Sequence, residues 1–331
     1  KREFLNGTPL NISAMRFGPD GHMYFLVGGR NTASKLYRVR YTGPKGDGPK
    51  KVLTANQPLR DLRRSLEVFH GSRSGGVLAI EKAWPHLAHA DRNIRYAARL
   101  AIENQDLALW QDRVFAESDP RAVIYAVLAL CRHGERSLSS RVLAKLNALP
   151  FGQLGLEDQL ALLRAYSLCL IRWNEPSPAE VAAIQARLDP FYPAQNDQLD
   201  TELCRLLCHL DAPNVVSKTI ALMKATQTKT LAYDKAMLAR HEYGEAILET
   251  MANTPNSQNI HYAYSLRRVQ AGWTLEDRKF YFSWLHDTLQ KSGGLSFAGY
   301  IRAIREDAIA HLAAQDAAAI SWLLGDVAAV D

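Results

Sequence analysis

Two cysteines followed by a histidine come closer than any other residues in this chain to a known chemical motif. They lie in the run Cys204-Arg205-Leu206-Leu207-Cys208-His209. Covalent haem attachment uses two thiols followed by a histidine, but its usual spacing leaves two residues between the cysteines, and here there are three. The surrounding leucines indicate a buried helix, whereas haem attachment needs an accessible turn. A Cys204–Cys208 disulfide would join adjacent turns of one helix and constrain little, so we expect small core residues here.

His86 and His89 are the closest pair among the ten histidines. A spacing of three residues can place two imidazoles on one helix face, where they can bind a metal ion. No neighbouring Cys, Asp or Glu pattern completes such a site, and Pro85 disfavours a continuous helix through the pair. An ordinary surface pair is therefore the favoured interpretation.

Two further groups are weaker candidates for binding. The run Gly28-Gly29-Arg30-Asn31 is too short for a phosphate-binding loop and is more simply a turn that needs a positive φ. An aromatic set on the later helices could stack on bases or a sugar, but such a set is more often core: Trp273, Tyr281, Phe282 and Trp284. The sequence thus predicts no catalytic, cofactor-binding or metal-binding residue.

The composition is that of a globular chain of one long or two ordinary domains. Of the 331 residues, 47% are apolar and 22% charged. No apolar run approaches the roughly 18 residues that span a bilayer, and residues 1–10 lack the apolar core of a signal peptide. Because the chain begins with Lys1, we interpret it as a piece of a longer protein.

The net charge of +6 and the pI of about 9.1 permit binding to anions, but the basic residues are dispersed among 34 acidic ones. We interpret the densest arginine patches as solvent-exposed helix faces rather than as a specific anion-binding site: Arg60, Arg63 and Arg64, and Arg92, Arg95 and Arg99. The remaining cysteines, Cys131 and Cys169, also lie in apolar helical patterns and are expected in the core.

A repeated phrase in residues 91–134 indicates the architecture. The pattern Arg-x-[Ile/Val]-x-Tyr-Ala begins at Arg92 and again at Arg121, 29 residues later. Each copy follows an aspartate suited to capping a helix, and Gly134 suits a helix end. Residues 260–263, Ile-His-Tyr-Ala, repeat the phrase. Helix pairs of ~30 residues that cannot bury their apolar faces alone are typical of an α-solenoid of HEAT or armadillo type.

Capped amphipathic segments continue from Pro58 to the end of the chain. The predicted helices are 59–69, 77–87, 94–101, 105–115, 123–130, 138–149, 156–173, a helix capped at Ser177, 199–210, 214–225, 230–253, one starting at 254–255, 275–290, 297–314 and 317–324. Tyr96, Tyr125 and Tyr262 occupy equivalent places in the repeated phrase. Each ring is therefore expected between helices.

Residues 4–42 follow a different pattern. Aromatic and β-branched residues in 22–27 and 35–41 predict two strands, and the Gly- and Pro-rich run 42–51 predicts a linker. Two strands are too few to bury all the apolar side chains of this segment away from water: Phe17, Tyr24, Leu26, Leu36 and Val39. The segment therefore either joins a sheet outside this chain or docks onto the first helices near Leu62 and Val77.

The motifs, in their order, resemble a family. Residues 17–21, Tyr24, 28–30 and 36–39 look like the closing strands of a six-bladed propeller of the soluble sugar-dehydrogenase type. Several helical motifs resemble a segment of large exported proteins of planctomycetes and verrucomicrobia: residues 95–99, 119–122, 259–263, 272–274, 296–299 and 304–308. Those proteins are described as membrane-bound dehydrogenases with a c-type cytochrome domain, and in them this segment follows the propeller.

The resemblance implies three parts: propeller strands in 1–43, a linker in 44–57 and an all-α, HEAT-like repeat domain in 58–331. It implies a periplasmic or extracellular scaffold that positions the propeller against a haem domain or protein partner. Haem c and a quinone or metal cofactor would belong to the parent oxidoreductase and not to this segment. The alternative is a HEAT-like nucleic-acid-binding protein or DNA base glycosylase, which would gather the six arginines above on one stripe.

Overall fold

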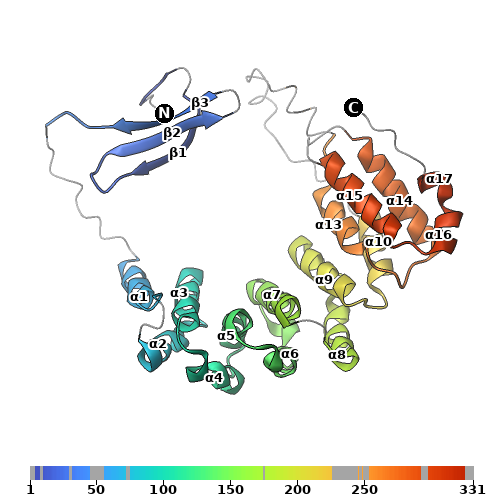
Figure 1. Ribbon diagram of the computed structural model, residues 1–331, viewed down its shortest axis with the longest axis horizontal. Coiled ribbons are helices and arrows are strands. Elements are labelled where there is room, and N and C mark those ends of the chain that lie inside the picture. The colour runs from blue at the N-terminus through green and yellow to red at the C-terminus, as the bar shows by residue number, and fades with distance from the viewer. Residues whose placement is uncertain are drawn as a thin grey trace. The chain divides into compact units, whose positions relative to one another are not determined.

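The computed structural model describes residues 4–7, 10–29, 32–44, 56–71, 75–173, 176–225, 245, 248, 253–291 and 297–324. The chain divides into two compact units, residues 1–57 and 58–331. Figure 1 shows strands in the first unit and helices in the second. The predicted N-terminal β segment and the predominantly helical remainder are thus confirmed. The predicted helix at 230–253 lies outside the described residues, except for Glu245, Leu248 and Asn253.

The first unit is a three-stranded antiparallel sheet in the order β1 (Ile12–Phe17), β2 (Met23–Gly29) and β3 (Thr32–Val39). Two strands were expected, and β1 is the addition. All six residues of β1 are exposed, so it carries no burial pattern that the sequence could reveal. The expected turn at Gly29 has a φ of 155°.

One face of the sheet is apolar and largely uncovered. The strand register places Met15 opposite Phe25 and Phe25 opposite Tyr37, so these three side chains share a face. The rings of Phe25 and Tyr37 stack with centroids 5.1 Å apart. Phe25 is buried, but Phe17, in register with Met23, is 74% exposed. We name this surface, with Met15, Phe17, Met23, Phe25 and Tyr37, the apolar sheet face.

Every regular element described after Val39 is helical. The α-helices are α1 (Gln57–Glu67), α2 (Gly76–Ala83), α3 (Arg92–Glu103), α4 (Gln111–Ala116), α5 (Pro120–His133), α6 (Ser139–Asn147), α7 (Leu156–Trp173), α8 (Pro178–Leu188), α9 (Asp197–His209), α10 (Val215–Ala225), α13 (Ser257–Leu266), α14 (Leu275–Leu289), α15 (Phe297–Ala310), α16 (Ala314–Ala319) and α17 (Ser321–Leu324). Short 3₁₀ turns join several of them. None of the described helices is both long and apolar enough to cross a bilayer.

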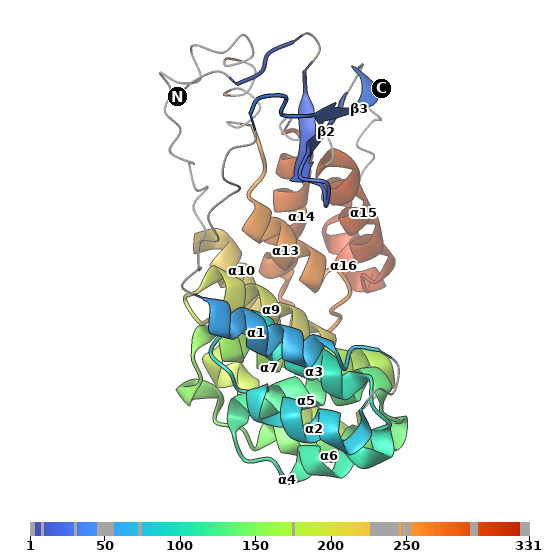
Figure 2. The same cartoon turned by 90° about the vertical axis from the view of Figure 1, so that its left-hand side faces the viewer.

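The helices form two rows that pack on each other. In the first row, α3 contacts α5, α5 contacts α7, α7 contacts α9, α9 contacts α13 and α13 contacts α15. Helices α2, α4, α6, α8, α10 and α14 form the second row, and each contacts at least one helix of the first. Figure 1 shows α3, α5 and α7 side by side, and Figure 2 views the same succession from the end that carries α1 and α2.

Local capping explains where several helices begin. The carboxylate of Asp91 accepts hydrogen bonds from the N–H groups of Asn93 and Ile94, and that of Asp119 accepts one from Ala122. Ser177 and Glu180 form the expected capping box of α8. These bonds satisfy amides that have no partner within the helix.

Gly134 ends α5 for a reason that the sequence pattern did not indicate. Its φ of −77° and ψ of 166° are extended rather than left-handed. A Cβ atom at this position would lie 2.7 Å from the carbonyl oxygen of Leu130 and 3.2 Å from the Trp173 ring. Glycine is therefore required by close packing and not by backbone conformation.

The expected equivalence of the three tyrosines is wrong. Tyr96 is 55% exposed, Tyr125 is half-buried and Tyr262 is 2% exposed. Capping explains the difference. Tyr96 lies five residues after its cap Asp91, whereas Tyr125 and Tyr262 each lie six residues after their caps, Asp119 and Asn256. One residue turns a helical side chain by about 100°, so Tyr262 corresponds to buried Ala97, and His261 corresponds to Tyr96.

Alanine substitutions test this assignment. Because Tyr262 is buried, Tyr262→Ala should lower the free energy of unfolding by ~3–5 kcal/mol. Tyr96→Ala removes an exposed ring and should cost no more than about 0.5 kcal/mol. Urea unfolding, followed by the helical circular dichroism signal, measures both. Equal losses for the two variants would contradict the assigned phase of α13.

Candidate functional site

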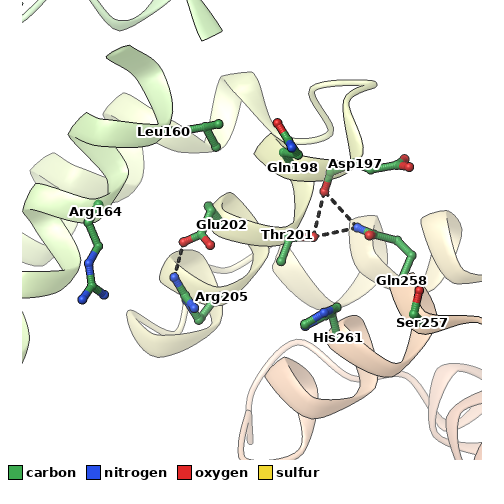
Figure 3. A pocket seen from close by; sticks show the side chains of 10 residues that line it. All are labelled: Leu160, Arg164, Asp197, Gln198, Thr201, Glu202, Arg205, Ser257, Gln258 and His261. Atoms are coloured by element: carbon green, nitrogen blue, oxygen red, sulfur yellow. Dashed lines mark hydrogen bonds and ion pairs between the residues drawn. The ribbon is translucent and has the colours of Figure 1, made fainter. Parts of the chain in front are cut away.

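An open groove of about 650 Å³ crosses the first row at α7, α9 and α13. Figure 3 shows the side chains that line it: Leu160 and Arg164 from α7; Asp197, Gln198, Thr201, Glu202 and Arg205 from α9; and Ser257, Gln258 and His261 from α13. The lining is mostly polar. We name this hollow the α9 groove.

The start of α9 is held in place by two side chains that bind backbone amides. Asn196 caps the helix by accepting from the N–H groups of Gln198 and Leu199. The buried carboxylate of Asp200 accepts from Ala194 N at 2.6 Å and from Asn196 N at 3.1 Å. Burial raises the pKa of Asp200, and these two hydrogen bonds act in the opposite direction. The turn before α9 is thereby fixed, which positions the groove-lining residues of its first turns.

A small residue in the groove, Thr201, occupies a position that carries a tyrosine ring in α3. Thr201 lies five residues after the cap Asn196, as Tyr96 lies five residues after Asp91. The Tyr96 ring lies beside Arg99 on α3, whereas the short side chain of Thr201 lines the hollow that α7 and α13 flank.

Hydrogen bonds tie the floor of the groove to one wall. Gln258 Nε2 donates to Thr201 Oγ1 at 2.8 Å and to the carbonyl oxygen of Asp197 at 3.1 Å. Thr201 Oγ1 in turn donates to the same carbonyl at 2.7 Å. The dashed lines in Figure 3 trace these bonds between α9 and α13. The two helices are therefore joined across the groove floor.

The groove lining carries two arginines, Arg164 and Arg205, and two acidic residues, Asp197 and Glu202. Arg205 forms an ion pair with Glu202, one turn earlier in α9. Arg164, exposed on α7, has no hydrogen bond or ion pair to any part of the chain that the structure describes. Arg164 and the Arg205–Glu202 pair border the open space between α7 and α9 (Figure 3). The groove thus offers one guanidinium without a carboxylate partner.

The groove brings together side chains that can donate and accept hydrogen bonds. His261, Ser257 and Thr201 supply an imidazole and two hydroxyls, but among the described contacts no hydrogen bond links His261 to either hydroxyl. The neighbouring Tyr262 is no base, because burial raises its pKa to about 12. Within the described ranges, no group of three or more His, Cys, Asp or Glu residues is placed to hold a metal ion.

The sequence candidates lie elsewhere or in the core. Cys204 and Cys208 are buried free thiols in α9, with their sulfur atoms 3.8 Å apart, and His209 is exposed at the helix end. Cys131 and Cys169 are also buried. Thr219 Oγ1 lies 3.6 Å from the Cys204 sulfur, which places this thiol among core groups.

The histidine pair and the aromatic set have structural roles. His86 ends a 3₁₀ turn that follows α2, and His89 Nδ1 accepts from the N–H of Asp91 at 3.0 Å. The two imidazole rings lie 6.1 Å apart. All four aromatic residues belong to the core or pack against it: Trp273, Tyr281, Phe282 and Trp284. Arg30 and Asn31 lie outside the described residues.

The six arginines do not form one exposed stripe. Arg95 is fully buried: its Nη1 donates to the carbonyl oxygens of His89 and Ala90, and its Nη2 pairs with Glu157. Arg99 is mostly buried and pairs with Glu103 at 3.0 Å. Arg63 pairs with Glu67 within α1. Only part of the expected basic surface is therefore accessible.

Comparisons with protein families, curated proteins and solved structures find no match. The α9 groove was not anticipated from the sequence, because its residues come from three helices separated by up to about a hundred positions. The one available signal was the spacing of five residues from a helix cap to an exposed side chain, which α3 and α13 share. Read from Asn196, that spacing places Thr201 where α3 has Tyr96.

Two substitutions in α9 test the origin of the groove. Thr201→Tyr places a ring in an open hollow and should change the free energy of unfolding by no more than about 1.5 kcal/mol, mainly through the lost Gln258 bond. Leu203→Tyr, at a fully buried position, should cost ~1–3 kcal/mol or more through overpacking. Chemical denaturation measures both. A larger loss for Thr201→Tyr would show that this position faces the core.

Proposed function

We propose that the helical unit is an α-solenoid of HEAT-like repeats that acts as a non-catalytic scaffold for protein binding. The observation that carries the proposal is the order of contacts in the first row, where each helix packs on the preceding and following ones. Repeat proteins bury a continuous core in this way and present one helix layer to partners. The capped starts of α3, α5, α9 and α13 support a common repeat unit.

The residue motifs extend the proposal to the parent protein. On their resemblance, the chain belongs to a larger exported protein of the dehydrogenase and cytochrome kind, located in the periplasm or outside the cell. The helical unit would position a sugar-dehydrogenase-like propeller against a haem domain or another protein. The polar lining of the α9 groove, with no activated nucleophile among its described contacts, supports the scaffold role over catalysis.

The first unit fits the proposed propeller context. Its apolar sheet face leaves Met15 58% and Phe17 74% exposed, and β1 and β3 each have an edge without a neighbouring strand within the described sheet. A three-stranded sheet with such a face gains stability when another layer covers it. The adjoining blade of a propeller would provide that layer.

The alternative of nucleic-acid binding is not favoured. It requires the six arginines on one accessible stripe, but Arg95 is buried and Arg99 and Arg63 pair with glutamates. Phosphate contacts need accessible cations. The protein scaffold therefore remains the proposal that agrees with the observed side-chain positions.

Small-angle X-ray scattering of residues 52–331 tests the solenoid. A compact domain of this length has a radius of gyration of about 19 Å, and an extended stack should clearly exceed it. The full chain serves as a control for the integrity of the fragment. If the fragment also melts at the temperature of the full chain's helices, the β segment is not part of the helical fold. A value near that of a compact domain would contradict the solenoid.

The coding sequence on both sides of this chain tests the parent protein independently. Propeller repeats before Lys1 and a Cys-x-x-Cys-His motif after Asp331 are the expected result. This outcome would place the sheet beside its missing blades and a haem-binding domain after the helices. An unrelated domain on either side would overturn the dehydrogenase context while leaving the scaffold proposal to the scattering experiment.

A further inference from the structure

The α9 groove contains a cation that is free to bind a ligand. Arg205 is neutralised by Glu202, and Arg164 has no carboxylate partner within the described ranges, although Asp197 also lines the groove. A guanidinium holds a carboxylate through two parallel hydrogen bonds and is less strongly hydrated than an ammonium group. The amides of Gln198 and Gln258 and the hydroxyl of Ser257 line the same space and can bind peptide groups.

The binding surface continues beyond the groove. Tyr264 follows His261 by three residues, so both lie on one side of α13. Its ring stacks on that of Tyr300 in α15 with centroids 5.8 Å apart, and the rings are 37% and 43% exposed. The Arg267 guanidinium lies 3.6 Å from the Tyr264 ring centroid, which orders this pair. Tyrosine and arginine are the residue types that dominate protein-binding hot spots.

Asp307, an acidic residue near the tyrosine pair, is already engaged. It accepts from Arg267 and Arg268, each at 2.8 Å. Two guanidinium groups therefore compensate the charge of Asp307, so it does not exclude an incoming carboxylate, and Arg164 lies farther along the surface without a partner among the described residues. Adjacent helices are spaced by ~8–10 Å, so a strand from α7 to α15 crosses about 25–30 Å. An extended peptide of about eight or nine residues spans that length.

Building on the scaffold function, we propose that this surface binds an extended acidic segment of a protein partner. Arg164 holds a carboxylate of the segment in the α9 groove. The exposed rings of Tyr264 and Tyr300 pack against an apolar side chain farther along it. The occupant is a peptide rather than a small molecule because the anchoring groups are distributed over four helices.

Fluorescence anisotropy with the full chain tests the inference. The probes are nine-residue labelled peptides with one phenylalanine and either glutamate, glutamine or lysine at the remaining charged positions. The glutamate peptide should bind saturably, more weakly at higher salt, and at least several-fold more tightly than the other two. Arg164→Glu should weaken its binding roughly tenfold or more, as expected for a charge-assisted contact.

Lys279→Glu is the matched control, because it makes the same charge change at an exposed position of α14 in the second row. It should alter binding less than twofold. Tyr264→Ala should weaken binding several-fold, while Arg164→Lys should retain part of it. Circular dichroism of each variant confirms folding before binding is compared.

Several results would overturn the inference. These are no saturable binding of the glutamate peptide, equal binding of the glutamine peptide, equal loss in the two charge-reversal variants, or tighter binding of single-stranded oligothymidylate than of the peptide. The scaffold proposal is tested separately by scattering. If scattering shows an elongated helical unit but the glutamate peptide does not bind, only the acidic-segment inference is contradicted. If scattering shows a compact unit, the scaffold proposal is contradicted.

Discussion

The width of the apolar surface on each first-row helix is the constraint on which the helical unit depends. In α5, nine of the fourteen residues are buried, from Ala122 to Cys131 with the exception of Tyr125. A stripe this wide cannot be covered by one neighbouring helix. It is covered by α3 and α7 on its two sides and by α4 and α6 from the second row. What remains accessible is a narrow face, which carries the exposed Tyr96 of α3, the half-buried Tyr125 of α5 and the α9 groove.

Buried charge adds a second constraint on neighbouring helices. Arg95 passes over the Tyr125 ring at 5.0 Å and reaches Glu157, so one side chain of α3 touches both α5 and α7. Burial raises the pKa of Glu103, although Arg99, Arg132 and His133 surround it and oppose the shift. Removing one partner of such a group leaves a buried charge uncompensated, which costs more than the contact itself contributes. These pairs therefore favour a single arrangement of the helices.

Features set by local chemistry could be predicted from the sequence, while features set by assembly could not. The capping box at Ser177 and Glu180 and the span of α7 depend on adjacent residues, and the structure has both as predicted. Strand β1 was missed because none of its side chains is buried. Tyr262 was assigned to the wrong face because the phrase was aligned by residue type, whereas helix phase is counted from the cap. The groove residues meet only through packing of α7, α9 and α13.

The position five residues after the cap has an implication for how such a surface diversifies. At this position α3 has an exposed tyrosine, α13 an exposed histidine and α9 a half-buried threonine, whereas α5 has the fully buried Ile124. Exchange of one such side chain for a smaller or larger one would open or close a hollow without repacking the interior. Recognition could thus be relocated along the row, or given a new specificity, by single substitutions that the fold tolerates. Because the buried side chains can stay unchanged while an outer side chain is exchanged, the surface of this architecture can be re-engineered one helix at a time.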